Sequence, residues 1–188
     1  MKKKVVFYLS NNDQRMECLL KVMEAFVEFN LDQEYTIKVI FGAKLDKNLI
    51  PKAFQKYIEH PSDAEAQEDL ATAKYLLSGE SLPKYFVCKE GQNVIRFFDK
   101  FHKEENNRLE LAQNKLSWLI NSTFVFTEDA KSADYLSNNP YFIELQGKVE
   151  QFSEDVIRSK EEIMDHILNR KVEGVKSDKE HILIFVSA

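Results

Sequence analysis

Glycine is scarce in this chain, with five residues among 188. Loops that wrap the phosphates of a nucleotide need several glycines close together, because their backbone must approach the ligand closely. The sequence has neither a Walker A motif nor a G-x-G-x-x-G motif, and the G-x-S-x-G turn of α/β-hydrolases is also missing. The best-known signatures of nucleotide binding and serine hydrolysis are therefore excluded.

Long apolar runs and cysteines are few as well. No run is long enough to span a bilayer, and Val5–Leu9, which follows the basic N-terminus, is too short for a secretion signal. The two cysteines, Cys18 and Cys88, lie far apart and do not form the disulfide framework of a small secreted domain. We therefore expect a cytoplasmic protein without a membrane partner.

Positive charge is not in excess. Lysine and arginine number 26 against 31 aspartates and glutamates, which leaves a net charge of −5. A nucleic-acid-binding protein usually carries a basic excess, so we expect no nucleic-acid partner. The four histidines show no metal-ligand spacing, and the sequence predicts neither a metal site nor a cofactor.

The chain does contain enough apolar and aromatic residues, 44% and 12%, to fill a core. The pattern predicts a single α/β domain over residues 1–188, with helices on both faces of a mixed sheet of about five strands. Short runs rich in β-branched and aromatic residues predict strands at 4–10, 35–41, 123–127 and 181–186. Amphipathic spacing predicts helices near 13–29, within 45–79, and at 104–120 and 148–169. Ser62 and Glu65 match the capping-box pattern of a helix start.

The sequence pattern of residues 82–98 predicts a β-hairpin. Its strands are Tyr85–Cys88 and Asn93–Phe98, which are rich in aromatic and β-branched residues. Gly91 lies between them and supplies the positive φ that a tight connection often needs. Pro83 stands just ahead of the first strand, where its missing backbone donor does little harm.

The order of these elements resembles the thioredoxin-like fold over about residues 4–120. Val5–Ser10, followed at once by a helix, is similar to the strand and active-site helix of that family. Tyr35–Phe41 is similar to its next central strand, and the segment around Pro83 resembles its cis-proline segment and terminal hairpin. The helical stretch 45–79 would stand where related disulfide oxidoreductases carry a helical insertion.

Residues 121–188 exceed the length of a thioredoxin tail. Their pattern predicts a strand–helix–strand extension, which either continues the same sheet or packs beside it. The sequence alone leaves these two arrangements open.

The redox centre of the thioredoxin-like family is missing. That family carries a C-x-x-C pair at the start of its first helix, whereas this chain has Asn11-Asn12-Asp13-Gln14 there. The resemblance therefore implies a domain without dithiol chemistry. We expect a non-catalytic binding or scaffold module that acts through a protein partner or as a homo-oligomer, with strand addition at the sheet edge beside Pro83 as one route.

A second function is open, because polar residues follow several of the predicted strands. In an open, Rossmann-like α/β sheet, ligands collect beyond the carboxyl ends of the strands. Carboxylates and amides placed there would make a site in a small enzyme or binding protein for a small molecule, a phosphorylated ligand among them. The alternative is that these residues only cap helices and turns. The candidate ligand-binding residues are Asn12, Asp13, Asp46, Pro83 and Asp129.

The two folds predict different neighbours for these residues. In a thioredoxin-like sheet, Pro83 would face Asn12 and Asp13 across a shallow groove. In a Rossmann-like sheet, Asp13 and Asp129 would meet in one pocket.

Overall fold

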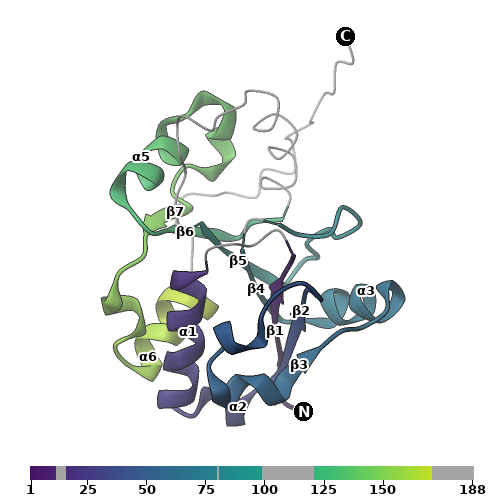
Figure 1. The fold of residues 1–188 in the computed structure, drawn as a ribbon. Coiled ribbons are helices and arrows are strands. Elements are labelled where there is room, and N and C mark those ends of the chain that lie inside the picture. Colours follow the sequence, from purple (N-terminus) through teal and green to yellow (C-terminus); the bar gives the residue numbers. More distant parts are fainter. Residues whose placement is uncertain (12–15, 80, 99–120, 171–188) are drawn as a thin grey trace.

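The structure, a computed structural model, describes residues 1–11, 16–79, 81–98 and 121–170 (Figure 1). The strand expected at 181–186 and the helix expected at 104–120 lie outside the described residues, as do Asn12 and Asp13.

In the described part of the chain, seven strands form one sheet in the order β3-β2-β1-β4-β5-β6-β7, and every neighbouring pair is parallel. The predicted α/β class is confirmed. The sheet differs from the expected mixed sheet of about five strands, since all its described pairings are parallel and it is larger. The strands are β1 (Lys4–Leu9), β2 (Thr36–Phe41), β3 (Ile58–Glu59), β4 (Tyr75–Ser78), β5 (Asn93–Phe98), β6 (Phe124–Thr127) and β7 (Val149–Gln151).

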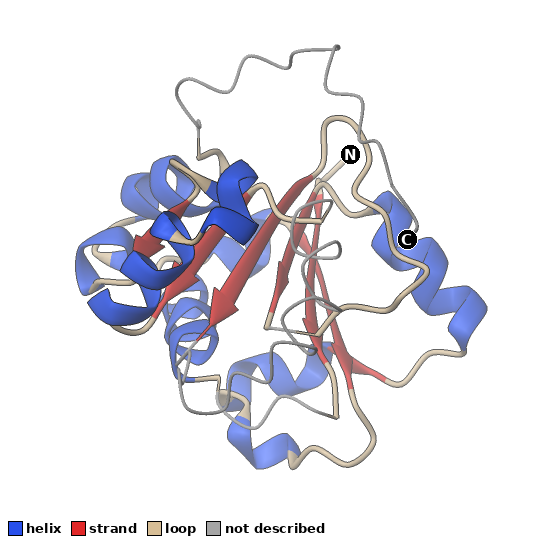
Figure 2. Ribbon diagram, turned by 90° about the horizontal axis from the view of Figure 1, so that it is seen from above, coloured by secondary structure: helices blue, strands red, loops and turns tan. Residues whose placement is uncertain are grey.

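Helices cover both faces of this sheet (Figure 2). The α-helices are α1 (Glu17–Glu28), α2 (Leu31–Glu34), α3 (Asp63–Thr72), α5 (Ala130–Asn138) and α6 (Lys160–Ile163). The 3-10 turns are η1 (Lys47–Leu49), η2 (Lys52–Tyr57), η4 (Pro140–Leu145) and η5 (Glu154–Ile157), and η6 (Met164–Leu168) is a π-helical turn.

Successive residues of a strand point to opposite faces, and β1 shows the consequence. Val5 and Phe7 belong to the core cluster that includes residues of α1, whereas Val6 belongs to the cluster that includes Leu70 of α3. Because both faces are covered, β1 is apolar at successive positions. That is why a continuous apolar run predicted this strand correctly.

The predicted hairpin at 82–98 does not form. Asn93–Phe98 is strand β5, but residues 85–88 lie in the loop that precedes it. The partner of β5 is β4, which pairs with it in parallel. The sequence predicts a helical stretch that includes Tyr75–Ser78, because an apolar run of four residues does not distinguish a buried strand from a buried helix.

Two local predictions in this part of the chain are confirmed, and the structure decides the state of the bond before Pro83, which the sequence leaves open. Gly91 has the expected positive φ, 83°. Ser62 and Glu65 form the expected capping box at the start of α3. Among the described residues no peptide bond is cis, so the bond before Pro83 is trans, unlike that of the thioredoxin-like family.

Two longer predictions are wrong. The stretch 45–79 is not a continuous helical insertion, because it contains β3 and β4 beside α3. The long helix expected at 148–169 is divided into β7 and short helical pieces, since Val149–Gln151 pairs with β6. The sheet also has no edge beside Pro83, because β5 lies between β4 and β6. Strand addition at that place is therefore excluded.

Candidate functional site

The carboxyl ends of the strands all lie at one edge of the sheet, because the strands are parallel. The chain leaves β1 for β2 through α1, which covers one face, and returns from β3 to β4 through α3, which covers the other face. β1 and β4 are neighbours in the sheet. The chain then leaves β4 for β5 through a loop whose Phe86 belongs to the same cluster as Leu70 of α3. The connections that begin at β1 and at β4 thus run on opposite faces.

The loops that follow β1 and β2 are held together at this edge. The Asn11 side chain accepts a hydrogen bond through its Oδ1 from the Lys44 backbone N, at 2.8 Å. The Gly42 N donates to the Leu9 O at 2.9 Å. A Cβ on Gly42 would lie 2.2 Å from Asn11 Oδ1 and 2.7 Å from the Asn11 N, so a side chain has no room there.

Replacing Gly42 by alanine is expected to lower the free energy of unfolding by about 1–3 kcal/mol, the usual cost of forcing extra atoms into a filled space. Urea unfolding would measure the change. Gly91→Ala is the control, since nothing lies within 4 Å of its Cβ position and only its positive φ opposes the substitution. If Gly42→Ala were no more destabilising than Gly91→Ala, the two loops would not be in fixed contact.

The structure gives local roles to two of the predicted site residues. Asp46 Oδ1 accepts from the Asn48 N at 2.9 Å and caps η1. Asp129 Oδ1 accepts from the Ser132 N at 2.7 Å and caps α5. These contacts are those of ordinary helix caps.

Two of the predicted site residues, Asp46 and Asp129, do not lie in one pocket. Asp46 follows β2 and Asp129 follows β6, and three strands lie between these two strands. At the usual spacing of strands this separates them by about 19 Å. β1, which precedes Asp13, is about 14 Å from β6 by the same measure. Pro83 lies partly exposed in the loop between β4 and β5.

A row of polar side chains near the carboxyl ends escaped the sequence interpretation. Tyr8, Ser78 and Arg96 are aligned on β1, β4 and β5 and share the face that α3 covers. Ser78 and Arg96 are both 0% exposed. Arg96 Nε and Ser78 Oγ each donate to the Gly79 carbonyl, at 3.4 and 3.3 Å. Arg96 is the single charged residue in the apolar run 94–98, and this was the sequence signal that could have revealed the row.

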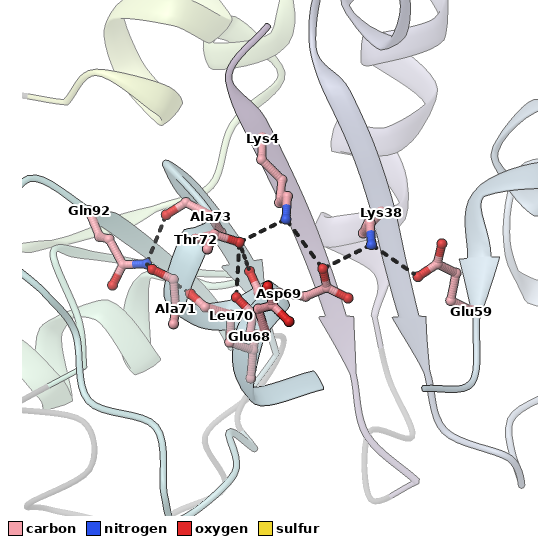
Figure 3. A network of polar contacts seen from close by, with 10 residues as sticks. All are labelled: Lys4, Lys38, Glu59, Glu68, Asp69, Leu70, Ala71, Thr72, Ala73 and Gln92. Atoms are coloured by element: carbon pink, nitrogen blue, oxygen red, sulfur yellow. Dashed lines mark hydrogen bonds and ion pairs between the residues drawn. The ribbon is translucent and has the colours of Figure 1, made fainter. Parts of the chain in front are cut away.

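A charged cleft of about 640 Å³ lies on the same face, beside α3. Its centre is Asp69, 7% exposed, whose Oδ1 lies 3.3 Å from Lys4 Nζ and 2.9 Å from Lys38 Nζ (Figure 3). Lys38 Nζ also lies 3.6 Å from Glu59 Oε2, and Lys4 Nζ donates to Thr72 Oγ1 at 2.7 Å. The network joins β1, β2 and β3 to α3.

The protonation state of this network indicates a structural role. The hydrogen bond to Asp69 raises the pKa of Lys38 above its ordinary value, although partial burial opposes the shift. A lysine acts as a base or nucleophile when its pKa is lowered, not raised. Lys38 is therefore held in its charged form and ties the strands to the helix.

Comparisons of this chain with protein-family models, with curated proteins and with solved structures found no match. The resemblance to the thioredoxin-like fold stays a prediction. The function is therefore inferred from the topology of the sheet and from the residues along its carboxyl edge.

The described residues contain no group of three or more His, Cys, Asp or Glu side chains that could hold a metal ion. No helix in the described part of the chain has the length and apolarity to cross a membrane. Cys18 and Cys88 are not joined by a disulfide. Burial raises the pKa of the Cys88 thiol, which disfavours the reactive thiolate.

Proposed function

We propose that this chain is a Rossmann-like domain that binds a small phosphorylated molecule at the carboxyl edge of its sheet, between β1 and β4. The observation that carries the proposal is the strand order. Its first six strands follow the order 3-2-1-4-5-6, which is the order of doubly wound dinucleotide-binding sheets. In such sheets the ligand binds where neighbouring connections run on opposite faces, and β1 and β4 are that pair here.

The residues at this edge suit an anionic ligand. Lys44 is exposed, and its position is fixed by the hydrogen bond between its backbone N and Asn11. It forms no ion pair with a described residue. A lysine on a fixed loop can meet a phosphate without first giving up a carboxylate partner. Because the chain lacks a glycine-rich loop, we place the contact on side chains.

Thermal unfolding against a panel of nucleotides and sugar phosphates tests the proposal. A ligand present at a hundred times its dissociation constant is expected to add about 2.7 kcal/mol to the free energy of unfolding. Lys44→Glu should reduce this gain. Lys3→Glu is the matched control, because Lys3 is exposed and precedes β1 at the opposite edge of the sheet. A gain that survives Lys44→Glu unchanged would place the ligand elsewhere.

A second candidate is the protein-binding or scaffold module, and one observation favours it. Tyr85 and Val87, in the loop after Pro83, are 42% and 59% exposed. Neighbouring exposed apolar side chains often mark a contact with another chain. If no ligand of the panel raised the unfolding temperature, and if the apparent mass rose with protein concentration in sedimentation equilibrium, this second function would be favoured over the first.

A further inference from the structure

The connection between β2 and β3 is basic, although the whole chain is acidic. Residues 43–58 carry four lysines and a single carboxylate, that of Asp46, in a chain of net charge −5. The lysines are Lys44, Lys47, Lys52 and Lys56.

These four lysines lie at the surface, and Lys56 Nζ also lies 5.0 Å from the centroid of the Tyr57 ring. All four are exposed, and none forms an ion pair with a described residue. The one carboxylate of the segment is already engaged, because Asp46 Oδ1 accepts from the Asn48 N. The positive charge of the segment is thus not neutralised from within.

An apolar side chain projects from the middle of this segment. Leu49 is 49% exposed and lies between Lys47 and Lys52 in the sequence. Its neighbours hold the backbone in place, since Ile50 is 2% exposed and Phe54 0% exposed in the core cluster that contains Phe7. The segment therefore presents Leu49 and its lysines on a rigid base.

The opposite charge lies on the other face of the sheet. Residues 59–72, which include α3, carry five carboxylates and no lysine or arginine. α3 belongs to the cluster on the face opposite to Ile50 and Phe54. On the basic side, α1 exposes Glu24 and Glu28, and its exposed Lys21 lies 3.4 Å from Glu154 Oε1. A flat anionic surface would meet the molecule at this segment.

We propose, against the expectation from the sequence that there is no membrane partner, that residues 43–58 dock the protein on an anionic lipid surface, with the lysines at the headgroups and Leu49 in the interface. Exposed lysines around an apolar side chain suit the boundary between lipid headgroups and acyl chains. The apolar stems of the lysine side chains and Leu49 enter this boundary, while the ammonium groups stay at the headgroups. Each lysine close to such a surface multiplies the partition coefficient by roughly fivefold. A nucleic acid fits less well, since the aromatic ring of the segment nearest the lysines, Tyr57, packs edge-on against Phe54 instead of standing free to stack on a base.

Co-sedimentation of the full chain with vesicles tests this. We expect binding to phosphatidylcholine vesicles that contain phosphatidylserine, no binding to pure phosphatidylcholine vesicles, and loss of binding at high salt. Lys47→Glu with Lys52→Glu should lower the partition coefficient by about 25-fold or more. Leu49→Ser should lower it less. Co-sedimentation with vesicles does not involve the small phosphorylated ligand proposed above, so failure of one proposal is distinguishable from failure of the other.

Lys84→Glu with Lys89→Glu is the matched control. Both lysines are exposed in the loop between β4 and β5, and the pair changes the net charge equally. An equal loss from both pairs would make the effect one of net charge and overturn the proposal. No binding by the unaltered chain would overturn it too, as would binding to duplex DNA in place of vesicles. If the glutamate pair did not fold, Lys47→Gln with Lys52→Gln would take its place, with about 25-fold weaker binding again expected.

Discussion

Replacing Phe7 by alanine is expected to lower the free energy of unfolding by about 4 kcal/mol. Phe7 is 0% exposed in β1, with β2 on one side and β4 on the other. Its ring centroid lies 5.4 Å from that of Phe26 in α1 and 5.3 Å from that of Phe54 in η2, in both cases edge to face. The substitution removes apolar contacts with two elements and leaves a cavity that the rigid sheet does not close.

Urea unfolding at neutral pH measures this loss. Phe7→Leu keeps much of the side-chain volume. Conservative core swaps usually cost less than about 1.5 kcal/mol, so the loss for this variant should be well below that for Phe7→Ala. Ile143→Ala is the exposed control, at 58% exposure, with an expected change within about 0.5 kcal/mol. A loss for Phe7→Ala that matched the Ile143 control would mean that η2 and α1 do not pack on β1 as described.

Replacing Asp69 by alanine is expected to cost about 3 kcal/mol. The change leaves Lys4 and Lys38 without their shared carboxylate. Loss of one partner from a buried ion pair usually costs 3 to 5 kcal/mol, so about 3 kcal/mol is the lower end of that range. The lower end applies because the Lys4 and Lys38 side chains keep 24% and 29% of their exposure and regain some hydration. Glu68→Ala, an exposed change on the same helix, is the control, with an expected cost within about 0.5 kcal/mol.

The stabilisation by Asp69 should also depend on pH. The folded pKa of Lys38 is raised above its ordinary value, chiefly by the hydrogen bond to Asp69. The stabilisation is therefore fully present below that value and is lost as the pH rises through the folded pKa. The stability difference between the unaltered chain and Asp69→Ala should narrow as an alkaline titration passes that point. A difference that stayed constant would assign the effect of Asp69 to packing instead of charge.

Part of the candidate site was within reach of the sequence. Asp46 and Asp129 were singled out because they follow predicted strands, and each does stand at the start of a helix as a cap. Capping depends on neighbours within three residues, so a local pattern predicts it. Arg96 and Asp69 went unnoticed because their partners come from other elements, such as Gly79 for Arg96 and Lys38 for Asp69.

The sequence by itself determined the α/β class, the strands within 4–10, 35–41 and 123–127, and the capping box that starts α3. Each of these depends on residues that are close together in the chain, where hydrophobic period and capping chemistry act. Only the tertiary structure decided that β4 is a strand, that β5 pairs with it in parallel, and that β1 and β4 are neighbours. These features depend on backbone hydrogen bonds between distant segments, and any apolar run of suitable length can offer such bonds, so local composition does not specify them.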